Sequence, residues 1–185
     1  MNMSEEIRIY ASREKVFAAL NDPIILQQVI PGCEELEQIS DFELRATVKA
    51  KVGPVTAKFQ GNVKLSDINP PASYTITGEG SGGPAGFAKG VARVKLAEDG
   101  NATILFYEVN AEVGGKLAQV GGRLIEGSSK KLAREFFKNF SDLVDQTDLS
   151  PDTTPVQVAT HFQFETLLWT ELAIVTVIIL TGLAS

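Results

Sequence analysis

The chain of 185 residues has one cysteine, Cys33, and one histidine, His161. A single cysteine excludes an intramolecular disulfide, which is typical of a reducing compartment. A nucleophilic cysteine needs a neighbouring base, and His161 lies far along the chain, so we interpret Cys33 as a small, half-buried residue. No group of cysteine, histidine and acidic residues has the spacing of metal ligands, so the sequence predicts no metal site.

Basic residues are missing from the last part of the chain. Residues 141–185 contain six acidic side chains and no lysine or arginine, so the whole net charge of −6 lies there. Residues 1–140 contain 17 basic and 17 acidic side chains and are neutral. A neutral body gives no electrostatic reason to expect binding to nucleic acid. The first residues carry no apolar run, so we expect no signal peptide.

A long apolar run occurs in one place, near the end of the chain. Residues 150–155 have two prolines and no apolar side chain, which predicts a linker. Residues 167–183 then form a mostly apolar run of 17 residues, about 25 Å long as a helix, against a bilayer core of about 30 Å. We divide the chain into a folded domain (1–147), a linker (148–160) and a hydrophobic tail helix (161–185).

Two interpretations of the hydrophobic tail are open. It is either a short C-terminal membrane anchor or a helix that packs on its own domain or on a partner. We favour the anchor, because a run so rich in isoleucine, valine and leucine promotes aggregation in water. Since the basic residues all lie in the body, we expect the domain at the cytoplasmic face of the cell membrane.

Periodicity in the body predicts an α+β fold. Residues 5–11 alternate in polarity and predict a strand, after which Ser12 and Pro23 mark the starts of two short helices, the second over residues 24–30. Residues 34–113 have period two, broken by turn residues, and predict about six further strands. The turns between them are short, so the strands should form an antiparallel meander.

A helical period follows from Gly114 to Val144 and predicts one long helix. Its expected inner face is Leu117, Val120, Leu124, Ser128, Leu132, Phe136, Phe140 and Leu143. The glycines in its first part would serve either close packing on the sheet or space for a ligand. These are Gly114, Gly115, Gly121, Gly122 and Gly127. A curved sheet of about seven strands around this helix would leave a cavity between them.

The glycine-rich run over residues 78–90 contains Gly78, Gly80 and Gly83 at the spacing of a dinucleotide-binding loop. No helix follows to hold a pyrophosphate, so we do not expect nucleotide binding. We interpret the run as a loop between strands, either a mobile connection or a flexible rim of the cavity. Phe87 is its one large apolar residue.

Two further patterns have a weak functional interpretation. Lys130, Arg134 and Lys138 are spaced four residues apart, which is typical of a solvated helix face, or of a surface turned toward anionic lipid. The loose candidates for acid–base catalysis have no convincing spacing, so an enzyme is the least favoured class. They are Tyr10, Tyr74, Tyr107, Glu108 and Glu112.

Five groups of residues, in order over residues 3–145, resemble one protein family. They are Leu20-Asn21-Asp22-Pro23 with Ile30-Pro31-Gly32-Cys33; Val52-Gly53-Pro54-Val55 with Phe59-Gln60-Gly61; Gly78-Glu79-Gly80 with Ala85-Gly86-Phe87-Ala88-Lys89-Gly90; Gly114-Gly115-Lys116-Leu117-Ala118-Gln119; and Phe136-Phe137. The chain resembles the family of the carbon monoxide dehydrogenase G subunit, within the START-like helix-grip superfamily (SRPBCC). The resemblance implies a helix-grip fold and a non-catalytic accessory protein of a molybdenum-containing CO dehydrogenase-type enzyme.

The resemblance also implies a link to the membrane and to respiratory quinone. We therefore expect a lipophilic ligand, by implication a non-covalently bound quinone, in the helix-grip cavity, and no covalent cofactor. The expected partners are a molybdenum hydroxylase of the CO dehydrogenase type and membrane lipid, the latter through the tail. The alternatives are an adaptor without ligand and, less favoured, a helix-grip cyclase or hydrolase. The predicted cavity lining is Phe17, Leu20, Leu26, Val29, Phe59, Phe87, Leu105, Tyr107, Val109, Leu117, Val120, Leu124 and Phe136.

Overall fold

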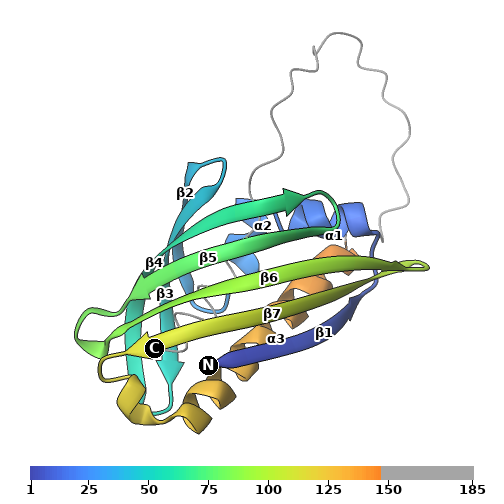
Figure 1. The fold of residues 1–185 in the computed structure, drawn as a ribbon. Coiled ribbons are helices and arrows are strands. Elements are labelled where there is room, and N and C mark those ends of the chain that lie inside the picture. The colour runs from blue at the N-terminus through green and yellow to red at the C-terminus, as the bar shows by residue number, and fades with distance from the viewer. Residues whose placement is uncertain (147–185) are drawn as a thin grey trace.

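The computed structural model describes residues 1–146, so the predicted linker and hydrophobic tail lie outside the described residues. Seven strands, three α-helices and two short 3₁₀ turns follow one another along the chain (Figure 1). They are β1 (Asn2–Ile9), α1 (Arg13–Ala19), α2 (Pro23–Val29), β2 (Cys33–Ser40), β3 (Glu43–Val52), β4 (Val55–Asn69), β5 (Ser73–Ser81), η1 (Gly83–Ala85), β6 (Phe87–Asp99), β7 (Ala102–Gly114), η2 (Ala118–Val120) and α3 (Gly122–Gln146).

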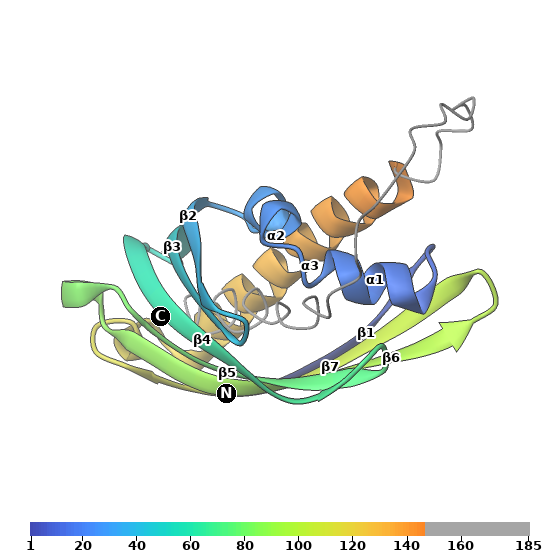
Figure 2. The same ribbon diagram turned by 90° about the horizontal axis from the view of Figure 1, so that it is seen from above.

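All seven strands belong to one antiparallel sheet, in the order β1-β7-β6-β5-β4-β3-β2. Strands β2 to β7 form the predicted meander, and β1 is added beside the last strand, with Ile7 opposite Leu105. The sheet curves, and α3 lies across its concave side with α1 and α2 (Figure 2). The predicted α+β architecture, with two short helices after the first strand and one long helix after the last, is confirmed.

Local rules explain where the short helices begin. The Ser12 side chain accepts a hydrogen bond from the Lys15 N–H at 3.3 Å, and Asp22 accepts one from the Ile24 N–H at 2.8 Å. Such caps satisfy amide groups that the first turn of a helix leaves free. Pro23 occupies the first position of α2, where no N–H is needed. The second helix therefore spans Pro23–Val29 rather than residues 24–30.

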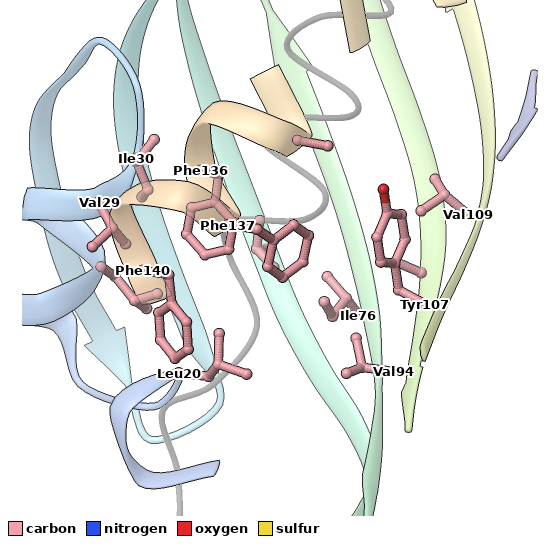
Figure 3. Close-up of a cluster of buried hydrophobic side chains, with 14 of the residues drawn as sticks. Leu20, Val29, Ile30, Ile76, Val94, Tyr107, Val109, Phe136, Phe137 and Phe140 are labelled. Carbon is pink, nitrogen blue, oxygen red and sulfur yellow. The ribbon is translucent and has the colours of Figure 1, made fainter. Parts of the chain in front are cut away.

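Aromatic side chains near the end of α3 form the centre of the core (Figure 3). The ring of Phe137 stacks on Tyr107 of β7 at 5.5 Å between centroids, and Phe136 meets Phe137 edge-on at 4.9 Å. Phe140 is fully buried and lies toward Leu20, between the sheet and the short helices (Figure 3). Burial of this much apolar surface is the main favourable term in folding.

The start of the long helix differs from the prediction. It begins at Gly122 rather than Gly114, because Gly115 and Gly121 adopt φ angles of 78° and 95°, which an α-helix does not allow. Of the five glycines assigned to its first part, two lie in α3, and Gly114 ends β7.

The buried face of α3 is consequently rotated from the predicted one over the first half of the helix. The buried residues there are Ile125, Ser129 and Ala133, while Leu124 is 53% exposed. The predicted face starts at Leu117 and runs through residues that are not helical, which shifts its phase. Further along the helix Phe136 and Phe140 are buried, as predicted.

Two other boundaries also differ. Strand β1 covers Asn2–Ile9 rather than residues 5–11. The glycine-rich run is mostly strand: Gly78 and Gly80 lie in β5, Gly90 lies in β6, and the connection between the two strands is residues 82–86. The prediction of a long loop is wrong, because pairing with the neighbouring strands keeps these glycines extended although glycine is typical of turns.

No helix within residues 1–146 is both long enough and apolar enough to cross a bilayer. The long helix α3 has 25 residues, but charged side chains follow its outer face, among them Lys130, Arg134 and Lys138. The predicted membrane anchor, residues 161–185, lies outside the described part of the chain.

We predict that Phe140→Ala lowers the free energy of unfolding by about 3–5 kcal/mol, the usual loss when a buried phenylalanine is truncated. Leu124→Ala, on the exposed side of the same helix, is the matched control and should change it by no more than about 0.5 kcal/mol. Urea unfolding followed by circular dichroism measures both. Equal losses would contradict the described orientation of α3.

Candidate functional site

Ten of the thirteen predicted lining residues are buried, and all ten belong to one hydrophobic cluster. Their contact with a ligand stays a prediction. Phe17 meets Tyr74 edge-on at 6.1 Å, and Figure 3 shows Val29 and Leu20 beside the phenylalanines of α3. Side chains packed in this way are part of the core. The buried ten are Phe17, Leu20, Leu26, Val29, Phe59, Leu105, Tyr107, Val109, Leu117 and Phe136.

The other three predicted residues lie at the surface or near it. Leu124 is exposed, as is Phe87 at 46%, and Val120 is half-buried. The ring of Phe87 covers Gly114 on the neighbouring strand β7, where a Cβ atom would collide with it. Val120 and Leu124 both approach the β3–β4 turn at Gly53, so they belong to one end of the molecule.

Four glycines meet on the inner face of the sheet. Gly61 of β4 stands directly opposite Gly80 of β5, and Gly78 of β5 stands opposite Gly90 of β6. They alternate with exposed residues and share the inward phase of buried neighbours such as Ile76. We call these four residues the glycine patch. Glycine within a strand is often the place where a ligand or another backbone approaches closely.

Alanines on the neighbouring strands continue the region without large side chains on both sides of the glycine patch. Ala46 pairs with Gly61, Ala88 with Gly80, and Ala111 with Gly90. Seven inward positions on five neighbouring strands therefore carry at most a methyl group. The sequence spacing does not show this, because the pairing of distant strands brings these residues together.

Gly80 has room for a Cβ atom on the inner face of the sheet. A Cβ atom at this position would have only the Gln60 carbonyl oxygen and the Gly61 Cα within 4 Å, at 3.7 and 3.8 Å. Both atoms belong to the adjacent strand, so no side chain of the helical layer reaches Gly80. At Gly90 a Cβ atom would lie 2.7 Å from the Asn110 carbonyl oxygen, so there the glycine lets two strands bend closely together.

The first half of α3 and the segment before it complete the surroundings. Ile125, Ser129 and Ala133 form the buried side of the helix in this half. Leu117 is fully buried, and its N–H donates a hydrogen bond to the Ala85 carbonyl oxygen at 3.1 Å. The candidate site is thus the glycine patch below the first half of α3, bounded by apolar side chains.

Tyr107 is the one predicted lining residue with a buried polar group. Its hydroxyl donates a hydrogen bond to the Glu5 carboxylate at 3.0 Å. Burial, reinforced by the negative charge of Glu5, raises the pKa of Tyr107 above its ordinary value. The hydroxyl therefore stays protonated at neutral pH and acts as a structural donor between β7 and β1.

The loose candidates for acid–base catalysis are not brought together. Tyr10 is exposed and lies beside Arg8. Tyr74 is buried, which raises its pKa, whereas Glu108 and Glu112 are exposed on the opposite face of the sheet from Tyr107. The geometry therefore supplies no acid–base pair from this set.

Cys33 is half-buried, as the sequence predicts. Burial raises the pKa of its thiol, and the sulfur donates a hydrogen bond to the Glu35 carbonyl oxygen at 3.5 Å. A raised pKa keeps the thiol protonated and poorly nucleophilic. Within residues 1–146 no group of three or more histidine, cysteine and acidic side chains is placed to hold a metal ion.

A groove of about 700 Å³ crosses the outer face of the sheet, on the side away from α3. Its walls carry charged side chains that neutralise one another. Lys89 pairs with Glu112 at 3.1 Å and Lys64 with Glu43 at 3.7 Å, and Arg45 donates to Asn62 at 3.2 Å. The groove has no connection to the predicted lining, whose residues point inward.

An open, curved antiparallel sheet with a long C-terminal helix across its concave side, and with two short helices after the first strand, defines a helix-grip protein. Solved structures of the same fold support this class. A conserved protein from Geobacillus kaustophilus has 32% sequence identity and a TM-score of 0.76, covering 80% of this chain and 97% of that chain. No curated protein sequence matches the chain.

More distant structures share the fold alone. TTHA0849 from Thermus thermophilus has 14% identity and a TM-score of 0.60, covering 80% of this chain and 99% of its own. Protein CV1439 from Chromobacterium violaceum has 13% identity and a TM-score of 0.60, covering 78% of this chain and 97% of its own.

The family model of the carbon monoxide dehydrogenase G subunit (CoxG) matches residues 6–145. The chain belongs to this family, which indicates an accessory role for CO dehydrogenase.

We predict opposite effects of the same substitution at two glycines of the patch. Gly80→Ala should leave the stability unchanged or raise it by up to about 1 kcal/mol, because the site has room and alanine restricts the unfolded chain. Gly90→Ala should lower it by about 1–3 kcal/mol, because the methyl group meets the Asn110 carbonyl oxygen. Thermal and urea unfolding measure both. A destabilised Gly80→Ala variant would show that the space above Gly80 is filled.

Proposed function

We propose that this protein binds a lipophilic molecule, a respiratory quinone, above the glycine patch and links a molybdenum-containing CO dehydrogenase-type enzyme to the membrane. The observation that carries the proposal is the pairing of Gly61 with Gly80 and of Gly78 with Gly90 on the inner face. Family membership supplies the enzyme class. The quinone is the ligand that the family resemblance implies.

The physical basis of the proposal is exclusion of water from an apolar molecule. Inward positions on and around the glycine patch carry apolar side chains or hydrogen, with Phe59 and Ile76 next to Gly61 and Gly78, so a bound molecule would meet apolar atoms and backbone. A flat ring can approach a glycine backbone more closely than any other residue allows. Pockets for small molecules in proteins are mostly apolar in the same way.

The proposed mechanism requires no covalent step by the protein. The ligand leaves the bilayer, is shielded between α3 and the sheet, and meets the redox enzyme while it is still bound. The hydrophobic tail would keep the domain close to the membrane, and the linker would let it reach its partner, which raises the local concentration of each. In this scheme the domain acts at the cytoplasmic face of the membrane.

An adaptor without ligand is the second candidate. Apolar side chains at the β2–β3 turn favour it, because Ile39 is 44% exposed and Phe42 is 45% exposed. Exposed apolar side chains close to each other are frequent in protein–protein interfaces. The two candidates differ in a simple way: the adaptor would contain no extractable lipophile.

We predict that the full chain, purified in mild detergent, contains close to one quinone per protein molecule by solvent extraction and mass spectrometry. Gly80→Leu should lose most of it, because the new side chain enters the open space. Gly122→Leu is the matched control: it makes the same change on the exposed first turn of α3, where a Cβ atom meets nothing, and it should keep the ligand. The absence of any lipophile from the parent protein would favour the adaptor.

We predict that a shortened chain ending at residue 150 leaves the membrane fraction when cells are separated by centrifugation, whereas the full chain stays with it. The reason is the loss of the apolar run over residues 167–183. If the shortened chain still carries quinone, the ligand belongs to the domain. A shortened chain that sediments as before would contradict anchoring by the tail.

A further inference from the structure

A pocket of about 440 Å³ lies at one edge of the sheet, apart from the glycine patch. Strand β2 pairs with β3 up to the contact between Cys33 and Val48, and one more backbone hydrogen bond joins the Lys49 N–H to the Gly32 carbonyl oxygen at 2.8 Å. Beyond this point the end of β3 faces α3 instead of a strand. The pocket occupies the gap between β3 and α3.

The pocket carries an excess of positive charge. Lys49 and Lys51 come from β3 and Lys131 from α3, against one carboxylate, Glu135. None of these three lysines forms an ion pair with any residue in the described part of the chain. Ser128 adds a hydroxyl group to the same wall. Lys49 and Lys51 flank the buried Ala50, so their side chains leave the edge strand on the outer face and border the pocket, whereas Lys131 and Ser128 lie on its α3 wall. An anion at this edge would meet their ammonium groups and the hydroxyl.

Elsewhere on the domain lysines are mostly neutralised. Five of them pair with carboxylates at 2.6–3.7 Å. The pairs are Lys58–Glu34, Lys64–Glu43, Lys89–Glu112, Lys130–Glu126 and Lys138–Asp142. The larger groove on the outer face is compensated in this way, so an anion would find uncompensated charge at the edge pocket and not there.

Apolar surface adjoins the basic pocket. Leu132 lines it and packs against the core. At the other end the pocket reaches the β3–β4 turn at Gly53, which contacts the exposed Leu124: a Cβ on the glycine would lie 3.7 Å from its Cδ1. Basic groups beside an exposed apolar side chain are the combination that binds the interface of an anionic bilayer.

We propose that the edge pocket binds the phosphate of an anionic membrane lipid. Lys49, Lys51 and Lys131 would surround the phosphate, while Leu124 enters the acyl boundary beside it. None of the residues of this surface belongs to the hydrophobic tail or to the glycine patch, so the proposal goes beyond the proposed function and the surface would operate with or without a bound quinone. It would orient the domain with the edge between β3 and α3 toward the bilayer.

The test compares binding of the full chain to vesicles of phosphatidylcholine alone and of phosphatidylcholine with phosphatidylglycerol, by co-sedimentation. The acidic tail is the same in the parent protein and in every variant, so the pocket is measured by the change in the ratio of the two affinities between parent and variant. We expect Lys51→Gln/Lys131→Gln to lower this ratio by about fivefold for each lysine removed. Lys64→Gln/Lys95→Gln removes the same charge from the outer face of the sheet and should preserve it.

Each other outcome overturns the proposal. Equal binding of the parent protein to both vesicles would exclude an anionic-lipid site, and equal losses in the two double variants would show a diffuse charge effect. Calorimetry also measures the affinity of the parent protein for inorganic phosphate. Tight binding of phosphate without preference for phosphatidylglycerol vesicles would identify a site for a free anion. Quinone extraction from the same variants separates a failure of this surface from a failure of the proposed carrier.

Discussion

The packing of the last three turns of α3 against the sheet holds the whole molecule together. Phe136, Phe137 and Phe140 occupy the concave side, where Tyr107 of β7 stacks on the middle ring. The short helices α1 and α2 lie beside this half of α3 (Figure 2). Because this half of the helix supplies the packing, the other half can lie above glycines and alanines without loss of the fold. Large packed side chains and small inward residues thus lie under different turns of one helix.

The same division explains the character of the two halves of the inner face. Around Ile76 and Val94 the sheet carries branched and aromatic side chains that fill the interior. At the glycine patch and the alanines beside it the inward groups are methyl groups or hydrogen, with Phe59 at the border. A core normally loses several kcal/mol when large side chains are replaced by small ones. A patch without large side chains therefore lowers the stability of the fold, unless another molecule makes the missing contacts.

Much of the fold follows from local patterns in the sequence. Ser12, Asp22 and Pro23 place the short helices because capping and the missing N–H of proline act within a few residues. Period-two alternation places the strands, and their short turns give the antiparallel order. The start of α3 does not follow, because Gly115 and Gly121 interrupt a spacing that otherwise suits a helix. Such backbone angles are not visible in a pattern of apolar residues.

The candidate site could be predicted less well than the fold. Leu20 and Val29, two of the predicted lining residues, are buried beside the phenylalanines of α3 (Figure 3), and their contact with a ligand stays a prediction. The glycine patch depends on strand register, which brings Gly61 to Gly80 and Gly78 to Gly90. Register is set by the pairing of whole strands, so a run of glycines in sequence gives no sign of where they meet.

The pairing of β1 with β7 has a consequence for the order of folding. The amide group of Ala111 bonds to the Met1 carbonyl oxygen, and the Tyr107 hydroxyl bonds to Glu5. The first strand to leave the ribosome must therefore wait for the last strand of the sheet before it can pair. Contacts between such distant residues form slowly. Until then β1 has no partner strand, and the same strand of a second nascent chain, or its β7, could pair with it, which makes crowded synthesis the stage at which this fold is most exposed to misassembly.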